Sequence, residues 1–135
     1  PDMSILRFIH WIINEEKVQV FGDGEQRRSF TYVKDVVDAL LKMSGLEKSH
    51  TFNVGSNMTV SLNDVIKLIE EYSGKSANIE NLERAYKDPD VVRPDLKNIK
   101  KIIGWEPTTS IEEGVEKTVA WYKKNEEYLK DLVYL

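Results

Sequence analysis

The chain contains no cysteine among its 135 residues. It therefore has no disulfide framework, no thiolate nucleophile and no cysteine-based metal site, and we expect a cytoplasmic protein. No apolar run approaches the roughly 20 residues of a membrane span, and the first residues lack the basic region of a signal peptide. Lysine and arginine, 19 in all, are outnumbered by 23 acidic residues, which argues against a nucleic-acid partner.

Glycine is also sparse, and its spacing excludes one large class of site. The seven glycines form no G-x-G-x-x-G or G-x-x-G-x-x-G run, the turn that binds a dinucleotide pyrophosphate between a strand and a helix. No tyrosine stands four residues before a lysine, the spacing at which a helical lysine lowers the pKa of a catalytic phenol. No histidine–carboxylate cluster has metal spacing, and no serine or cysteine triad is supported. We therefore predict no catalytic residue, no bound cofactor and no metal in this chain.

Hydrophobic periodicity predicts a mixed α/β domain that is mostly helical, with two or three short strands. Apolar residues recur at helical spacing in four segments, 3–15, 61–73, 99–103 and 111–122. Ser61 and Ser110 stand where N-caps are expected, and Gly74 stands where a helix should end. Short apolar runs at 18–21, 30–33, 51–54 and 78–82 are the candidates for strands. We expect one domain over residues 1–124, followed by a helical tail over residues 125–135.

The stretch 18–41 is the most informative part of the chain. It reads as a strand, a Gly-Asp-Gly turn at 22–24, a polar segment with Arg27 and Arg28, an extended run, and a helix capped by Asp35. Glycine permits the positive φ that such a turn requires. Two arginines held on rigid backbone between strands form the kind of positively charged fork that binds phosphate.

The run G-D-G-x-Q-x-R-S-F-x-Y-V-x-D-V at positions 22–36 resembles a signature of the extended short-chain dehydrogenase/reductases that act on nucleotide sugars. UDP-glucose 4-epimerase, dTDP-glucose 4,6-dehydratase and UDP-glucuronate decarboxylase belong to that family. The opening Pro1-Asp2-Met3, the Asn53-Val54-Gly55 run and the Gly104-Trp105-Glu106-Pro107 run fit it too. The resemblance spans residues 1–124 and implies the C-terminal, substrate-binding half of such an enzyme. The dinucleotide-binding (Rossmann) half, with its NAD, is then expected outside this chain.

The resemblance implies which residues bind the substrate near the turn. Arg28 matches the arginine expected to bind the diphosphate, and Phe21, which ends the preceding strand, is included with it. Asn53 matches an asparagine that donates to a phosphate in some members. Read from the residue alone, Asn53 could equally satisfy its own turn.

The loop 83–98 is dense in charge and proline, and the resemblance implies that it contacts the diphosphate and ribose. Arg84 and Asp88 are the implied contacts, and Arg93 is the alternative arginine. A loop of this length within a compact domain tends to be functional. A solvated charged surface is the alternative for any one of these residues.

These features predict a domain that holds the nucleoside diphosphate of a nucleotide sugar, with a UDP-sugar preferred, and that is inert alone. Two alternatives stay open: a free-standing nucleotide-binding or regulatory module, and a helical interaction protein without a ligand site. Absence of the Rossmann half is expected to leave apolar surface at Ile5, Phe8 or the tail segment 128–132. A homo-oligomer is therefore also expected.

Overall fold

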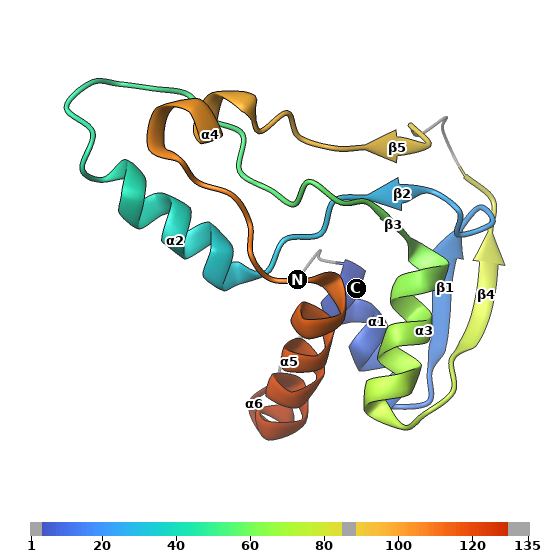
Figure 1. Cartoon of the computed structure of the whole chain (residues 1–135). Helices are drawn as coiled ribbons and strands as arrows, with labels where there is room; N and C mark the ends of the chain where they lie inside the picture. Colours follow the sequence, from blue (N-terminus) through green and yellow to red (C-terminus); the bar gives the residue numbers. More distant parts are fainter. Residues whose placement is uncertain (1–3, 85–88, 130–135) are drawn as a thin grey trace.

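The structure is a computed structural model that describes residues 4–84 and 89–129 (Figure 1). Over these residues the helices are α1 (Ser4–Ile13), α2 (Val33–Met43), α3 (Leu62–Ser73), α4 (Lys97–Ile103), α5 (Ile111–Lys124) and α6 (Glu126–Leu129). The strands are β1 (Lys17–Phe21), β2 (Arg27–Arg28), β3 (Val60–Ser61), β4 (Asn78–Leu82) and β5 (Val91–Val92). The predicted mixed, mostly helical α/β fold is confirmed.

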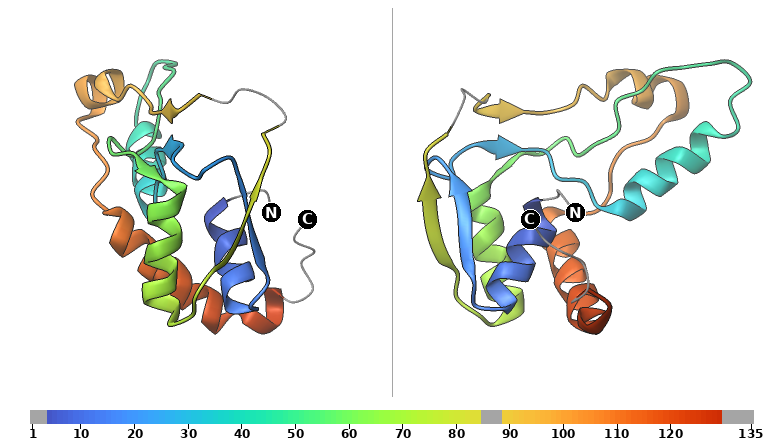
Figure 2. Two further views of the ribbon diagram at one scale, coloured as in Figure 1. Left: turned by 90° about the vertical axis from the view of Figure 1, so that its right-hand side faces the viewer. Right: turned by 180° about the vertical axis from the view of Figure 1, so that it is seen from behind.

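Three helices and two strands form the main body. α1, α3 and α5 pack together, and β1 of the parallel pair β1 and β4 packs against α1 (Figures 1 and 2). Along β1, Val18 and Val20 are buried while Gln19 and Phe21 are exposed, because successive side chains of a strand point to opposite faces. The core of the body is built from apolar side chains of the three helices and β1, including Ile9, Ile12, Val18, Val20, Ile66, Ile69, Val115, Val119 and Tyr122.

A second, smaller layer extends away from this body. β2 lies between β3, to which it is antiparallel, and β5, to which it is parallel. The adjoining chain leads to α2 and α4, which lie at the end of the molecule away from β1 and β4 (Figure 1). Ala39 of α2, Ile99 of α4 and the fully buried Trp105 form a separate small core there.

Several local predictions are confirmed. The hydroxyl of Ser61 accepts from the N–H of Asp64, and that of Ser110 accepts from the N–H of Glu113. Each serine is therefore an N-cap that satisfies one free N–H group of its helix. Gly74 ends α3 in the left-handed conformation, with φ of 75°, and the run 78–82 forms β4.

The start of α2 differs from the prediction. The run 30–33 is not a strand, and Arg27 and Arg28 themselves form β2 instead of lying between strands. Tyr32 stands at the N-cap without a side-chain bond. Asp35 is buried and accepts hydrogen bonds from Thr108 and Thr109, including the Thr109 N–H at 3.1 Å. A carboxylate that leaves water needs such donors, so Asp35 ties α2 to the segment before α5 and does not cap the helix.

One other prediction is also wrong, and the expected apolar surface at Ile5, Phe8 or the tail is found at only one of these places. The run 51–54 forms no strand, because no strand among the described residues pairs with it. Phe8 is buried and Ile5 is half-buried, whereas Tyr128 is exposed as expected; residues 130–132 of the tail lie outside the described residues. Within the described ranges, no helix is long and apolar enough to cross a membrane.

Candidate functional site

The Gly-Asp-Gly turn closes the end of β1 with a left-handed backbone, φ being 83° at Gly22 and 78° at Gly24. Both glycines also face close neighbours: a Cβ at Gly22 would collide with the guanidinium of Arg84, and one at Gly24 with the carboxamide of Asn63. Asn63 donates from Nδ2 to the carbonyl of Asp23 at 2.9 Å. Glycine is therefore favoured at both positions by the positive φ and by the close neighbours. The hydrogen bond from Asn63 fixes the turn to α3.

Arg84 lies across this turn, two residues after β4 ends. Its Nε donates to the carbonyl of Phe21 at 3.2 Å, its Nη2 donates to Oε1 of Gln26 at 2.8 Å, and the carboxylate of Asp23 lies 3.6 Å away. Gln26 is only 7% exposed and donates from Nε2 to the same Phe21 carbonyl at 2.9 Å. The buried amide therefore orients the guanidinium, because Gln26 and Arg84 bond to each other and share the Phe21 carbonyl as an acceptor.

Arg27 and Arg28 are neighbours on β2, yet they contact different groups. Arg27 is exposed and donates from Nη2 to the carbonyl of Thr59 at 2.7 Å. Arg28 is half-buried and donates from Nη1 to the carbonyls of Arg27 at 2.9 Å and Pro89 at 3.0 Å. These bonds hold the Arg28 head between β2 and the chain that enters β5.

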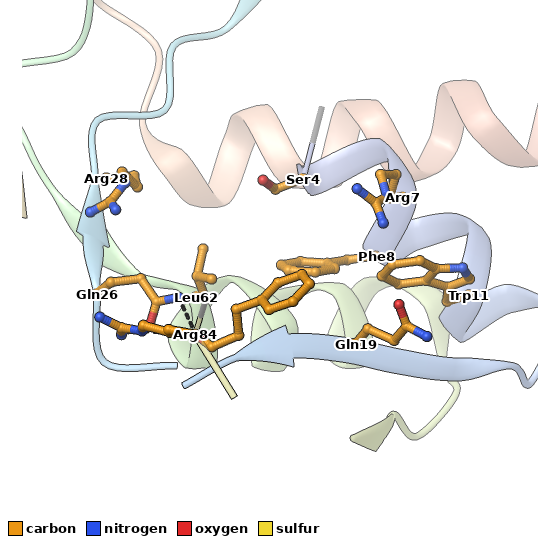
Figure 3. A pocket seen from close by; sticks show the side chains of 10 residues that line it. Ser4, Arg7, Phe8, Trp11, Gln19, Gln26, Arg28, Leu62 and Arg84 are labelled. Carbon is orange, nitrogen blue, oxygen red and sulfur yellow. Dashed lines mark hydrogen bonds between the residues drawn. The ribbon is translucent and has the colours of Figure 1, made fainter. Parts of the chain in front are cut away.

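Arg28 and Arg84 border the same open cavity of about 420 Å³, together with a third arginine, Arg7 of α1 (Figure 3). The Arg7 guanidinium lies over the ring of Trp11, 4.7 Å from its centre. No carboxylate lines the cavity within the described part of the chain. Positive charges gathered in a cleft make the local electrostatic potential more positive. The cavity therefore favours an anion with several negative oxygens. Its lining consists of Ser4, Arg7, Phe8, Trp11, Gln19, Phe21, Gln26, Arg28, Leu62 and Arg84.

Three of the six predicted site residues meet at this cavity, namely Phe21, Arg28 and Arg84. Two do not line it. Asn53 donates from Nδ2 to the carbonyl of Asp95 at 3.2 Å, and Arg93 is exposed. The sixth, Asp88, lies outside the described residues.

Sequence reasoning missed the contribution of α1. Arg7 and Trp11 line the cavity, but the helix was interpreted only through its apolar stripe. The two residues are four positions apart and therefore neighbours on one helix face. An arginine followed at that spacing by an aromatic ring, its guanidinium able to lie on the ring, is the signal that was available.

Known proteins match the chain over almost its whole length. A family model described as GDP-mannose 4,6 dehydratase matches residues 1–118. The chain belongs to this family. It is 42% identical to UDP-glucuronate 4-epimerase of Thermodesulfobacterium geofontis (strain OPF15), over 98% of the chain and 41% of that protein. It is also 32% identical to UDP-glucuronic acid decarboxylase 1 of Xenopus tropicalis, over 97% of the chain and 31% of that protein.

Solved structures match the chain as well. The UDP-glucuronic acid 4-epimerase of Bacillus cereus, in complex with UDP-glucuronic acid and NAD, matches with a TM-score of 0.84 and 28% identity. The match covers 92% of this chain and 40% of that one. The chain thus corresponds to the C-terminal part of NAD-dependent nucleotide-sugar epimerases and dehydratases, and spans about two fifths of the epimerases it matches.

The glycine turn of a dinucleotide site is not found among the described residues. A dinucleotide pyrophosphate needs open glycine backbone between a strand and a helix N-terminus. In this family member, the only glycine turn that follows a strand in the described ranges leads to β2, and Arg84 and Asn63 fill the space beside its glycines. No step of a reaction is therefore assigned to NAD on these residues. Within the same ranges, no group of three histidine or acidic side chains is placed to hold a metal ion.

Proposed function

We propose that the three-arginine cavity binds the diphosphate of a nucleotide sugar, with a UDP-sugar as the preferred ligand. The observation that carries the proposal is the convergence of Arg7, Arg28 and Arg84, from α1, β2 and the chain after β4, on one cavity. A pyrophosphate has oxygens enough to engage more than one guanidinium, and hydrogen bonds between ionised partners are about twice as strong as neutral ones. The relatives that act on UDP-glucuronic acid support the choice of UDP.

The aromatic lining suits the remainder of the nucleotide. Phe21 is 50% exposed, a large fraction for an apolar ring, and it lines the cavity together with Arg84 and Gln26. A uracil ring placed on it would cover the exposed face by stacking. Gln19, two residues before Phe21 on β1 and therefore on the same face of the strand, offers a carboxamide to the cavity.

The role of the domain is to bind and position. Neither a tyrosine–lysine pair at helical spacing nor a dinucleotide turn is present, so hydride and proton transfer belong to a further part of the protein, which we expect to hold NAD. Binding energy from the nucleotide, remote from the reacting carbon, would then hold the sugar against that part. An epimerase, a dehydratase and a decarboxylase all need this positioning.

Nuclear magnetic resonance titration of the isolated chain with UDP, UMP and inorganic pyrophosphate tests the proposal. UDP should shift the amide signals of residues that border the cavity, and pyrophosphate should compete for it. UMP should bind more weakly, because it lacks the second phosphate. Equal binding of UMP and UDP, or shifts spread away from the cavity, would show that the arginines do not recognise a diphosphate. Micromolar UDP affinity would instead favour the free-standing module.

A further inference from the structure

Arg84 borders two cavities of opposite electrostatic character. One is the three-arginine cavity described above. The other is an open cavity of about 550 Å³, and its lining consists of Gly22, Asp23, Glu25, Gln26, Arg84 and Asp90. One guanidinium is therefore shared between a cavity that favours anions and a cavity that already carries three carboxylates.

Asp23 is the carboxylate within ion-pair distance of Arg84 in the described part of the chain. Its Oδ1 lies 3.6 Å from Nη2 of Arg84, and the same Nη2 donates to Oε1 of Gln26 at 2.8 Å (Figure 3). Oδ1 of Asp23 also accepts from the N–H of Glu25 at 3.1 Å. The carboxylate is therefore positioned beside Arg84 by the backbone of the turn, although its side chain is 73% exposed.

A negative charge fixed on one side of a guanidinium weakens its attraction for an anion on the other side. The loss grows with the charge of the anion. At separations of roughly 6–7 Å, water and salt reduce the effect to about a twofold change in Kd for each pair of like charges. UDP-glucose, UDP and UTP carry about two, three and four negative charges at pH 8, because a terminal phosphate has a second pKa near 6. Asp23 should therefore oppose UTP most and UDP-glucose least.

We propose that Asp23 is a specificity-determining residue that makes the three-arginine cavity select nucleotide sugars over free nucleoside triphosphates. It does so by limiting the negative charge that the cavity accepts. The inference rests on the proposed function, because it concerns the ligand of the same cavity. Free nucleotides present the same base, ribose and phosphates as the nucleotide sugar, so attractive contacts alone distinguish them poorly. A repulsive element lowers the affinity of the competitor without adding a contact to the preferred ligand.

Asp23→Asn tests the proposal, with Glu71→Gln as its matched control. Asparagine keeps an oxygen that can accept from the Glu25 N–H but removes the charge. Glu71 is an exposed carboxylate in the last turn of α3. It lies roughly 14 Å of helix beyond Leu62, which lines the cavity, and this separation exceeds the Debye length of about 8 Å at physiological salt. Both substitutions change the net charge of the chain equally.

The Kd values of UDP-glucose, UDP and UTP are measured on the whole chain by nuclear magnetic resonance titration at pH 8, without magnesium. In the unaltered chain, UTP should bind no more tightly than UDP-glucose. Asp23→Asn should lower the Kd of UTP relative to that of UDP-glucose by about fourfold, with UDP intermediate, and the change should shrink in about 1 M salt. Glu71→Gln should leave the ratios unchanged.

An equal change in affinity for all three ligands would reduce Asp23 to a support of the turn and overturn the proposal. Unchanged ratios, or the same change from Glu71→Gln, would also overturn it. If the amide spectrum shows that Asp23→Asn does not fold, Asp23→Ser, which also retains an acceptor oxygen, is measured in its place and the same ratios decide. Absence of any shift at the cavity would overturn the proposed function and the inference with it, whereas unchanged ratios for ligands that do bind there would overturn the inference alone.

Discussion

Replacing Arg28 with alanine tests the diphosphate site most sharply, because the chain provides its own control in Arg27. The two arginines are adjacent on β2 and both donate to backbone carbonyls. Only Arg28 lines the cavity with Arg7 and Arg84. The loss of a positive charge on β2 should therefore change the stability of both variants alike. Only Arg28→Ala should lower the affinity for the ligand.

The magnitude follows from the contacts. Arg28→Ala removes one charge-assisted contact to a phosphate, worth about 2 kcal/mol, or about a 30-fold rise in the Kd of a UDP-sugar. Arg28 is held by the carbonyls of Arg27 and Pro89 before ligand arrives, so little ordering cost offsets this loss. Arg27 lies on exposed surface beside Thr59, and Arg27→Ala should change the Kd by about twofold or less.

The assay is isothermal titration calorimetry with UDP-glucuronic acid on a chimera in which the present chain replaces the matching 41% of the T. geofontis UDP-glucuronate 4-epimerase. The isolated chain is expected to bind too weakly for a 30-fold loss to be followed. Urea denaturation of each variant checks that the fold is retained. Equal losses from Arg27→Ala and Arg28→Ala would refute the reasoning, because the cavity distinguishes the two side chains. An unchanged Kd for Arg28→Ala would remove the residue from the site.

Three further predictions concern the turn, the buried carboxylate and the isolated chain. Gly22→Ala should destabilise the fold by about 1–3 kcal/mol and weaken UDP binding, because a side chain there is strained and meets Arg84. Gly74→Ala, left-handed but with open space around it, should cost about 1 kcal/mol in urea denaturation and leave UDP binding unchanged. Asp35→Ala should cost about 2–3 kcal/mol by the same method, because it leaves buried donors unpaired, while the exposed Asp38→Ala should stay within about 0.5 kcal/mol. By calorimetry the isolated chain should bind UDP with a Kd on the order of millimolar, about −4 kcal/mol, and bind no NAD specifically; turnover by the unassisted chain would contradict the assignment of chemistry to another part.

Local chemistry made much of this fold predictable. A serine hydroxyl three residues before a free N–H group, as at Ser61 and Ser110, acts within one turn of helix and needs no knowledge of the remainder of the chain. The left-handed glycine at position 74 is of the same kind. The Gly-Asp-Gly turn and the arginine that follows it were equally predictable, because the whole motif lies within ten residues of sequence.

The errors arose where a distant partner decides the outcome. Asp35 has the sequence of an N-cap, but α2 begins two residues earlier, and the carboxylate instead accepts from Thr108 and Thr109, more than 70 residues away. The run 51–54 has the composition of a strand, yet no strand among the described residues pairs with it. Arg7 lines the site because α1 packs beside β1. Helical periodicity predicts that α1 packs on the core, but it does not predict which element α1 contacts.

The parallel register of β1 and β4 makes the site unequally tolerant of changes in chain length. Phe21 pairs with Leu82, and the N–H of Gly22 donates to the carbonyl of Leu82 at 2.8 Å. The position of Arg84 relative to the turn is therefore set by the two-residue step from Leu82. One residue inserted between Leu82 and Arg84 would advance the guanidinium by roughly 3.3 Å and turn it to the opposite face. The same residue inserted at 75–76, before the strand begins, would be absorbed in the connection from α3. Homologous chains should therefore vary in length before β4 and keep a constant length from β4 to the arginine.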